Sequence, residues 1–348
     1  MKLKRLSAGL IGVVIFALGC SGEKRSAEVE PSSGEKSLTI GIVFDKGGRG
    51  DKSFNDSAWR GIERARNELG VAVVSRDSPA DKDYASNLSS LAAKNVDLIV
   101  GVGINMEKAM IEAANDNPDS RFAIVDGFID APNVRSLRFN EEQGSFLAGY
   151  LAGLMTKSGK IGFVGGQEID LIKKFYAGYA AGAKTANPRV EVLRPQYTGS
   201  WDDVGKGKLF GAAQYSAGAD IVYHAAGRCG LGVFQAAQAA GKYAIGVDSD
   251  QDDQAEGLVL TSMIKRVDEA VFQTIKDVKE GKFSAGAVTY DLKANGVGLS
   301  EMRFTKDKIG PENLAKIEGM RKKIISGELV VPTDMASLER YVAGLPKG

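Results

Sequence analysis

The sequence predicts an α/β fold made of two doubly wound lobes. The chain has 348 residues, which is more than one compact hydrophobic core usually holds, so two lobes are the natural expectation. From Leu38 onward, short apolar runs alternate with stretches of helical pattern, which is typical of β-α-β units in parallel sheets. The 43 glycines lie mostly at the turns between these segments, where positive φ or close backbone approach is useful.

The predicted strands are short apolar runs, most of them followed by Gly, Asp or Asn and then by a helical stretch. In chain order, strands are expected at residues 38–44, 72–76, 98–102, 121–126, 134–139, 160–164, 190–196, 221–224, 243–247 and 258–264. Helices are expected near residues 55–69, 84–94, 107–115, 142–155, 172–186, 205–217, 231–240 and 268–280.

The charge balance gives no sign of a nucleic-acid partner. The 45 Lys and Arg residues nearly cancel the 44 Asp and Glu residues, so the chain lacks the overall basic footprint that nucleic-acid binding needs. The hydrophobic fraction of 43% is ordinary for a globular protein. We therefore expect no nucleic-acid partner, unless a strongly basic patch is local.

The first twenty residues are predicted to be a lipoprotein signal peptide. Charged residues open the segment, an apolar run at 10–18 follows that is too short to span a bilayer, and Gly19 precedes Cys20. This layout resembles a bacterial lipobox, in which the cysteine is lipidated and becomes the mature N-terminus. Ala17 stands where such motifs usually have Leu, so an ordinary secretory signal with an incidental cysteine is the alternative.

Residues 21–37 are polar and show no period, so they are predicted to form a flexible tether. Together with the signal peptide, this tether would hold a folded region at 38–348 on a bacterial membrane, on the extracytoplasmic side. More than one acyl chain is needed for stable anchoring.

The residues that directly follow the strands are the candidates for ligand contacts. Ligands of open α/β sheets bind at the carboxyl ends of the strands. Three aspartates at such ends indicate a ligand rich in hydroxyl or N–H donors rather than an anion. The candidates are Asp45, Asp126, Asn140, the segment 224–230 and Asp248.

A Gly-rich loop at residues 45–55, DKGGRGDKSFN, joins the first strand to the first helix. It matches neither a Walker loop nor a dinucleotide-binding motif. Ser53 is a candidate cap for the helix, Phe54 could stack on a flat ring, and Asn55 offers both a donor and an acceptor. On composition alone, a tight turn with a core phenylalanine is the more common explanation.

The segment DKGGRGDKSFNDSAWRG resembles the opening signature of the basic membrane protein family of ABC-importer binding proteins, which includes the purine nucleoside receptor A proteins. EEQGSFLAGYLAGLMTKSGKIGFVGG, FYAGYAAGAK, GADIVYHAAGRCGLGVFQAA, IGVDSDQ and TSMIKRVDEAV are also similar to that family. The resemblance runs from about Leu38 to about Leu299. Each motif is weak alone, and their combination is highly specific.

The resemblance implies a type I periplasmic-binding-protein fold, with two Rossmann-like lobes joined by a hinge. The N-terminal lobe is expected at about 38–139 plus 261–290, and the C-terminal lobe at about 140–260 plus 291–348. The crossovers between lobes are expected near 138–142, 249–260 and 285–298. Closure of the hinge would bury a ligand between the lobes.

The resemblance also implies how a purine base would be held. Phe54 is expected on one face of the base, with Tyr223, His224 or Trp201 on the other, and Tyr223 is slightly preferred. Asn55 and Asp45 are expected to read the edge of the base.

Asp126, Asp248 and Lys265 are expected to contact ribose hydroxyls or base nitrogens, where charge-assisted bonds are strong. Gly227 belongs to a loop that usually reads A-G-G-T-G in the family. Arg228 and Cys229 depart from that pattern here.

The predicted function is therefore the substrate-binding lipoprotein of an ABC importer, a monomer that delivers a purine nucleoside to permease and ATPase subunits. No catalytic residue, metal or cofactor is expected. A binding protein for a sugar or a signalling furanose is the alternative. A nucleoside-processing enzyme would need clustered aspartates, which here lie one per strand, and a ligand-responsive regulator would need a DNA-binding module.

Overall fold

Six parallel strands form the first sheet of the computed structural model, which describes residues 37–346. The order across the sheet is β12-β5-β4-β3-β1-β2. The described residues belong to one compact unit. The strands are β1 (Thr39–Phe44), β2 (Ala72–Asp77), β3 (Leu98–Val102), β4 (Phe122–Val125), β5 (Val134–Phe139) and β12 (Gly286–Tyr290).

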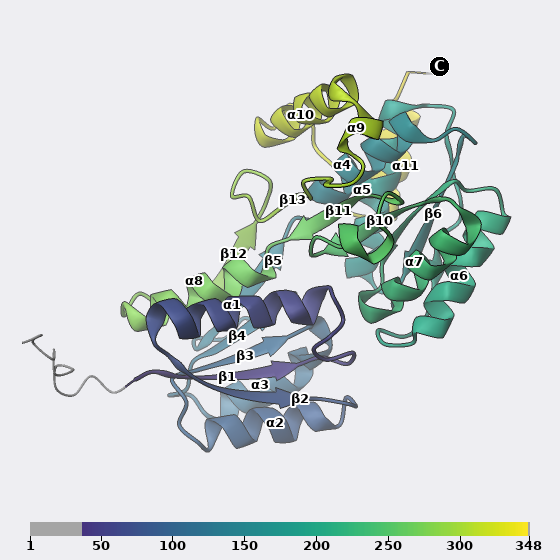
Figure 1. Ribbon diagram of the computed structural model, residues 1–348. Helices are drawn as coiled ribbons and strands as arrows, with labels where there is room; N and C mark the ends of the chain where they lie inside the picture. The colour runs from purple at the N-terminus through teal and green to yellow at the C-terminus, as the bar shows by residue number, and fades with distance from the viewer. Residues whose placement is uncertain (1–36, 347–348) are drawn as a thin grey trace, which may run out of the picture. The chain divides into compact units, whose positions relative to one another are not determined.

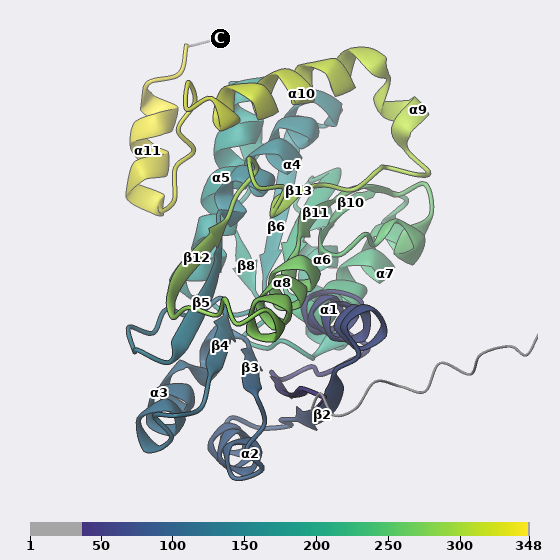
Figure 2. The ribbon, with the colours of Figure 1, turned by 90° about the vertical axis from the view of Figure 1, so that its left-hand side faces the viewer.

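Two pairs of helices cover the two faces of this sheet. α1 (Phe54–Leu69) and α8 (Val267–Lys279) pack together on one face, and α2 (Asp83–Ala92) and α3 (Glu107–Asp116) pack together on the other (Figure 2). Successive side chains of a strand point to opposite faces. Accordingly, Ile40 and Ile42 of β1 join the hydrophobic core on the α1 side, and Val43 joins the core on the α2 side. We call this part the N-terminal lobe.

The second sheet has the order β13-β11-β10-β9-β6-β7, with β8 also paired to β6. Its strands run parallel except β13, which is antiparallel to β11. The expected strand at 190–196 is instead two short strands, because Pro195 between them lacks a backbone N–H for the ladder. The strands are β6 (Lys160–Gly165), β7 (Glu191–Val192), β8 (Gln196–Tyr197), β9 (Ile221–Ala225), β10 (Tyr243–Asp248), β11 (Val259–Lys265) and β13 (Val297–Leu299).

Helices also cover both faces of the second sheet. α4 (Glu141–Met155) and α5 (Asp170–Ala186) pack together on one side, and α6 (Val204–Ser216) and α7 (Gly230–Ala240) pack together on the other. α4 and α5 approach closely because Gly178 has no side chain; a Cβ there would collide with the carbonyl of Glu142. A short helix, α9 (Lys306–Ile309), leads to α10 (Pro311–Ile325) and α11 (Met335–Ala343), which pack on α4 and α5. We call this part the C-terminal lobe.

The chain passes between the lobes three times. The crossovers lie between β5 and α4, between β11 and α8, and between β12 and β13. The second crossover leads into α8, and the third leaves from β12. Figure 1 shows both elements in green within the N-terminal lobe, which is otherwise purple and blue.

The expected second crossover at 249–260 is wrong, because β11 pairs with β10 in the second sheet. The chain therefore returns to the N-terminal lobe after Lys265 rather than at residue 261. The predicted α/β class with two doubly wound lobes is confirmed.

The predicted signal peptide at 1–20, its lipidated Cys20 and the tether up to residue 36 lie outside the described residues. Within the described part, none of the helices has the length and apolar character needed to cross a membrane.

Candidate ligand-binding site

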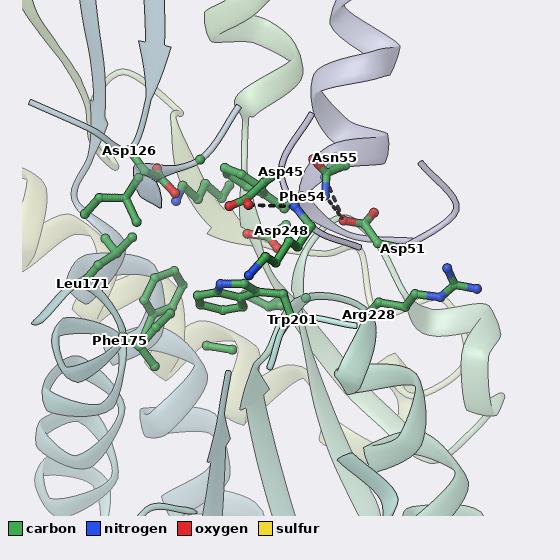
Figure 3. A pocket seen from close by; sticks show the side chains of 18 residues that line it. Asp45, Asp51, Phe54, Asn55, Asp126, Leu171, Phe175, Trp201, Arg228 and Asp248 are labelled. Atoms are coloured by element: carbon green, nitrogen blue, oxygen red, sulfur yellow. Dashed lines mark hydrogen bonds and ion pairs between the residues drawn. The ribbon is translucent and has the colours of Figure 1, made fainter. Parts of the chain in front are cut away.

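A pocket lies between the two lobes, with an empty volume of about 590 Å³, part of which is open to solvent. Four of its residues stand at or just past the carboxyl ends of β1, β4, β10 and β11: Asp45, Asp126, Asp248 and Lys265. This is the expected position for a ligand of open α/β sheets. Figure 3 shows the three aspartates. The pocket is also lined by Phe54, Asn55 and Gly227, so seven of the eight predicted residues are together and Tyr223 is not among them. Asn140, at another strand end, does not line it.

Asp45 is held in place by its neighbours at the end of β1. Its carboxylate accepts hydrogen bonds from the Tyr84 hydroxyl and from the backbone N–H of Lys46, the latter at 2.7 Å. Burial raises the pKa of Asp45 above its usual value, against the lowering effect of these hydrogen bonds. The side chain therefore presents a fixed acceptor to the pocket.

The N-terminus of α1 is capped by Asp51 and not by Ser53. The Asp51 carboxylate accepts the backbone N–H groups of Ser53, Asn55 and Asp56 at 2.8, 2.8 and 3.1 Å. The Ser53 hydroxyl instead donates to the carboxylate of Asp248 in the other lobe. A carboxylate two residues earlier satisfies the free N–H groups of the first turn, which leaves Ser53 free to join the lobes.

Further hydrogen bonds connect the lobes beside the pocket. The Ser249 hydroxyl donates to the Ser53 carbonyl at 2.9 Å, and the Arg60 guanidinium donates to the Ser249 hydroxyl at 2.8 Å. The Gln251 amide donates to the Lys52 carbonyl at 3.0 Å. The start of α1 is thus fastened to the loop after β10, which closes this side of the pocket.

Lys265 is a buried cation held between two carboxylates. Its side chain is 1% exposed, and its ammonium nitrogen lies 2.6 Å from Asp126 and 3.0 Å from Glu141. It also lies 5.2 Å from the ring centre of Phe54 and 5.5 Å from that of Phe175, within cation–π range. The lysine therefore fixes Asp126, which directly follows β4, to Glu141, which begins α4, across the first crossover.

The buried charges perturb one another. Burial disfavours the charge of Lys265, yet the carboxylates of Asp126, Glu141 and Asp248 together raise its pKa. Burial raises the pKa of Asp126 to about 6, although Lys265 opposes the shift. Burial acts the same way on Glu141, but Lys265 and Lys174 outweigh it and lower the pKa of that carboxyl. The carboxylates of Asp126 and Glu141 thus stay charged near neutral pH only because Lys265 and Lys174 lie beside them.

Asp248 should make the stability of the protein depend on pH. Burial raises its pKa from 3.8 to about 7, with Lys265 and Ser53 opposing the shift and Asp51 and Asp126 adding to it. A folded-state pKa above the unfolded value means that the folded protein favours the neutral form of Asp248. The stability that Asp248 contributes is therefore fully present below the unfolded pKa and is lost as pH rises through the folded pKa. The free energy of unfolding of the wild type, minus that of Asp248→Asn, should decrease as the pH rises from about 4 to about 8. Denaturant titrations across this range measure the difference, and a flat curve would contradict the assignment.

Aromatic side chains come to the pocket from both lobes. Phe54 begins α1 in the N-terminal lobe, while Phe175 of α5 and Trp201, in the loop after β8, come from the C-terminal lobe. The Trp201 ring lies against the backbone of Gly166, where a Cβ would collide with it. Among the described residues, the indole N–H has no acceptor. Two aromatic walls therefore face a ligand that enters between the lobes (Figure 3).

The preference for Tyr223 as the second stacking aromatic needs correction. Tyr223 is fully buried, packs against Phe163 and Tyr179, and has its hydroxyl 3.1 Å from that of Ser145. His224 points to the opposite face of β9 but is equally buried, against Phe234. Burial lowers the pKa of His224 to about 3, so it stays neutral at physiological pH. Of the three candidates, only Trp201 lines the pocket.

In the loop after β9, the two residues that depart from the family pattern, Arg228 and Cys229, lie in different surroundings. Gly227 has φ of 55°, a left-handed conformation that favours glycine, and lies against Trp201. Arg228 lines the pocket from an exposed position, with its guanidinium group extending away from Asp45, Asp126 and Asp248 (Figure 3). The Cys229 thiol is buried beneath the loop and donates to the Ser200 carbonyl at 3.3 Å. Cys229 therefore braces the segment that carries Trp201.

Sequence reasoning missed other residues in and beside the site, among them Asp51, Phe175 and Glu141. Asp51 and Phe175 line the pocket, and Glu141 shares Lys265 with Asp126. The Asp51 signal was available, because an acidic residue just before a helix is a common cap. Phe175 lies within a helix that reads as a core-packing element. No group of three His, Cys, Asp or Glu side chains suited to a metal ion occurs between residues 37 and 346.

Comparisons with known proteins show what this chain is similar to. A family model described as "ABC transporter substrate-binding protein PnrA-like" matches residues 39–335. A protein of Listeria innocua, named CD4+ T-cell-stimulating antigen, is 37% identical over 92% of this chain and 95% of its own length. The ABC transporter nucleoside-binding protein BmpA of Lactococcus lactis subsp. cremoris is 36% identical, covering 96% of this chain and all of the relative.

A solved structure of ABC transporter system solute-binding proteins from Aeropyrum pernix K1 superimposes with a TM-score of 0.80 at 30% identity. The match covers 87% of this chain and 96% of the other. This similarity confirms the predicted type I periplasmic-binding-protein fold.

Proposed function

Because this chain belongs to the Bmp family of PnrA-like ABC transporter substrate-binding proteins, we propose that it captures a purine nucleoside between its lobes and delivers it to a membrane permease. The observation that carries the proposal is a pocket with aromatic side chains from both lobes and carboxylates at the strand ends. Aromatic faces suit a flat base, and carboxylates suit the hydroxyls of a ribose.

The surroundings of the pocket support a ligand of this class. Asp126 and Asp248 would repel a phosphate, so a nucleoside fits better than a nucleotide. The name of the Lactococcus relative, a nucleoside-binding protein, points to the same ligand class.

Binding without chemistry is part of the proposal. The pocket carboxylates are already engaged, Asp45 with Tyr84, Asp126 with Lys265 and Asp248 with Ser53. They position a ligand by hydrogen bonds, and the hinge formed by the three crossovers closes over it. A separate ATPase subunit would supply the energy for transport through the permease, with this protein acting as a monomer.

A ligand panel tests the proposal. Purine nucleosides should stabilise the purified protein, by roughly 2.7 kcal/mol at a concentration 100 times the dissociation constant. Free bases, nucleotides and sugars should give smaller shifts of the melting temperature. Chromatography of the incubated nucleoside should recover it unchanged. Stabilisation by sugars alone would replace the nucleoside by a sugar ligand, and release of free base at a catalytic rate would make the protein an enzyme.

We also propose that the protein is lipid-anchored through Cys20, with its folded part outside the cytoplasm. The support is the charged start, apolar run and Gly-Cys junction of residues 1–20. The variant Cys20→Ser should lose incorporation of radiolabelled fatty acid, whereas Cys229→Ser should keep it. Equal labelling of wild type and Cys20→Ser would refute the anchor.

A further inference from the structure

Ser53 is a fully buried serine whose hydroxyl reaches from one lobe to the other. It belongs to the N-terminal lobe, and its hydroxyl donates to oxygen Oδ2 of Asp248 in the C-terminal lobe. Ser53 does not line the pocket. Its hydroxyl does not cap α1 either, because the Asp51 carboxylate accepts the backbone N–H groups there. The start of α1 therefore does not depend on this hydroxyl, whose main polar partner is Asp248.

Asp248 has one oxygen left for a ligand. It lines the pocket (Figure 3), and within residues 37–346 no hydrogen bond reaches its oxygen Oδ1. Its backbone φ is 64°, a left-handed conformation that residues other than glycine adopt rarely and that is often found at binding sites. Ser53 thus occupies Oδ2 and leaves Oδ1 as the acceptor that faces the pocket.

We propose that Ser53 is a positioning residue that orients Asp248 toward the ligand only when the lobes are closed. This inference rests on the proposed nucleoside function, in which the pocket carboxylates accept hydrogen bonds from the ligand. Ser53 and Asp248 belong to different lobes, so separation of the lobes breaks the bond between them. Closure therefore completes the acceptor, and a ligand held by Asp248 in turn favours closure.

The hydrogen bonds around this contact support the coupling. The Ser249 hydroxyl donates to the Ser53 carbonyl at 2.9 Å, so both the backbone and the side chain of Ser53 contact the loop after β10. On the other side of Asp248, the backbone N–H of Val247 donates to the Gln251 side chain at 2.8 Å. Both neighbours of Asp248 in the chain are thus anchored, which gives its side chain a fixed direction when the lobes meet.

Calorimetric titration tests the role of Ser53. The probe is whichever of adenosine, guanosine and inosine binds the wild type most tightly. At about pH 8, Ser53→Ala should raise the dissociation constant about tenfold, the effect of losing one hydrogen bond to a charged group. The change should lie mainly in the dissociation rate, measured by stopped-flow fluorescence, because the lost bond holds the lobes closed. The stoichiometry of the titration counts the folded protein, so misfolding would not imitate the result.

The effect of Ser53→Ala should be smaller at about pH 5 than at about pH 8, because a hydroxyl binds an ionised carboxylate more strongly than a neutral one. Burial raises the pKa of Asp248 to about 7, and Lys265 opposes this shift. Ser53 also opposes it, whereas Asp51 and Asp126 add to it. Asp248 is therefore mostly ionised at the higher pH and neutral at the lower. The charged neighbours are the same in wild type and variant, so they cancel in the ratio of the two dissociation constants.

Ser57→Ala is the matched control. Ser57 is also fully buried and lies on α1, but its hydroxyl accepts the backbone N–H of Asp268 at 3.2 Å within the same lobe. This variant should keep the wild-type dissociation constant at both pH values. Ser249→Ala is a second comparison, because it removes hydrogen bonds between the lobes that do not involve Asp248. Any loss of affinity in that variant should be the same at both pH values.

Three results would count against the proposal. An unchanged dissociation constant in Ser53→Ala, or an increase of equal size at the two pH values, would overturn the inference and leave the proposed function intact. The same pH dependence in Ser249→Ala would assign the effect to fastening of the lobes instead of to Asp248, and would also overturn the inference. Failure of all three nucleosides to bind the wild type would overturn the proposed function as well.

Discussion

Replacing Lys265 by methionine should destabilise the protein by about 3–5 kcal/mol, the usual cost of removing one partner from a buried ion pair. Lys265 is the cation shared by Asp126 and Glu141, at 2.6 and 3.0 Å, and all three side chains are almost fully buried. Without it, the buried carboxylates of Asp126 and Glu141 lose their shared cation. Urea denaturation of wild type and variant measures the loss.

The pH dependence of this loss identifies its cause. Without the lysine, the pKa values of Asp126 and Glu141 rise. Protonation of these carboxylates at low pH therefore reduces the loss in free energy of unfolding, and their ionisation at high pH increases it. The destabilisation should be smaller near pH 5 than near pH 8. Lys276→Met is the control, because Lys276 pairs with Glu280 at 3.9 Å on the surface, where such a pair contributes about 0–1 kcal/mol. Equal losses in the two variants would show that Lys265 is not an electrostatic centre.

Replacing Trp201 by alanine should weaken nucleoside binding by about 1–3 kcal/mol, the range for a base stacked on an aromatic ring. This corresponds to a dissociation constant about 5 to 150 times higher. Trp201 lines the pocket from the C-terminal lobe, opposite Phe54 of the N-terminal lobe. Trp201→Phe should keep most of the affinity, because a phenyl ring still stacks while the unpaired indole N–H is removed.

Trp59 provides both the control and the measurement. It is the other of the two tryptophans, belongs to α1, and does not line the pocket. Trp59→Phe should therefore bind nucleoside normally and should report binding through the fluorescence of Trp201 alone. An affinity of Trp201→Ala equal to that of the wild type would assign stacking to Phe175 instead.

The helices and most strands could be predicted because local pattern determines them. All eight predicted helices occur, α1 within one residue of its expected start and α2 within two residues of its expected end. The assignment of β11 to a lobe failed for a physical reason. A run such as Val259–Lys265 is buried on both faces, and the same apolar pattern suits a central strand of either sheet. The sequence of a strand alone does not determine which strands it pairs with.

The site could be predicted where position along a strand decides it. Asp45, Asp126 and Asp248 follow from the rule that ligands bind at strand ends. Tyr223 failed because a strand directs successive side chains to opposite faces, and the sequence did not show which face holds the core of Phe163 and Tyr179. Asp51 was missed because the capping role was given to Ser53, whose partner Asp248 is 195 residues away.

The three crossovers have a consequence for the order in which the protein matures during synthesis. The last strand of the first sheet, β12, ends at Tyr290, and the last strand of the second sheet, β13, ends at Leu299. A ribosome therefore finishes both sheets within a few residues of each other, after most of the chain has been made. Multidomain chains commonly fold their N-terminal domain first, but here neither lobe is complete early. Late, joint maturation suits a protein that the proposed export route must carry across a membrane before it folds.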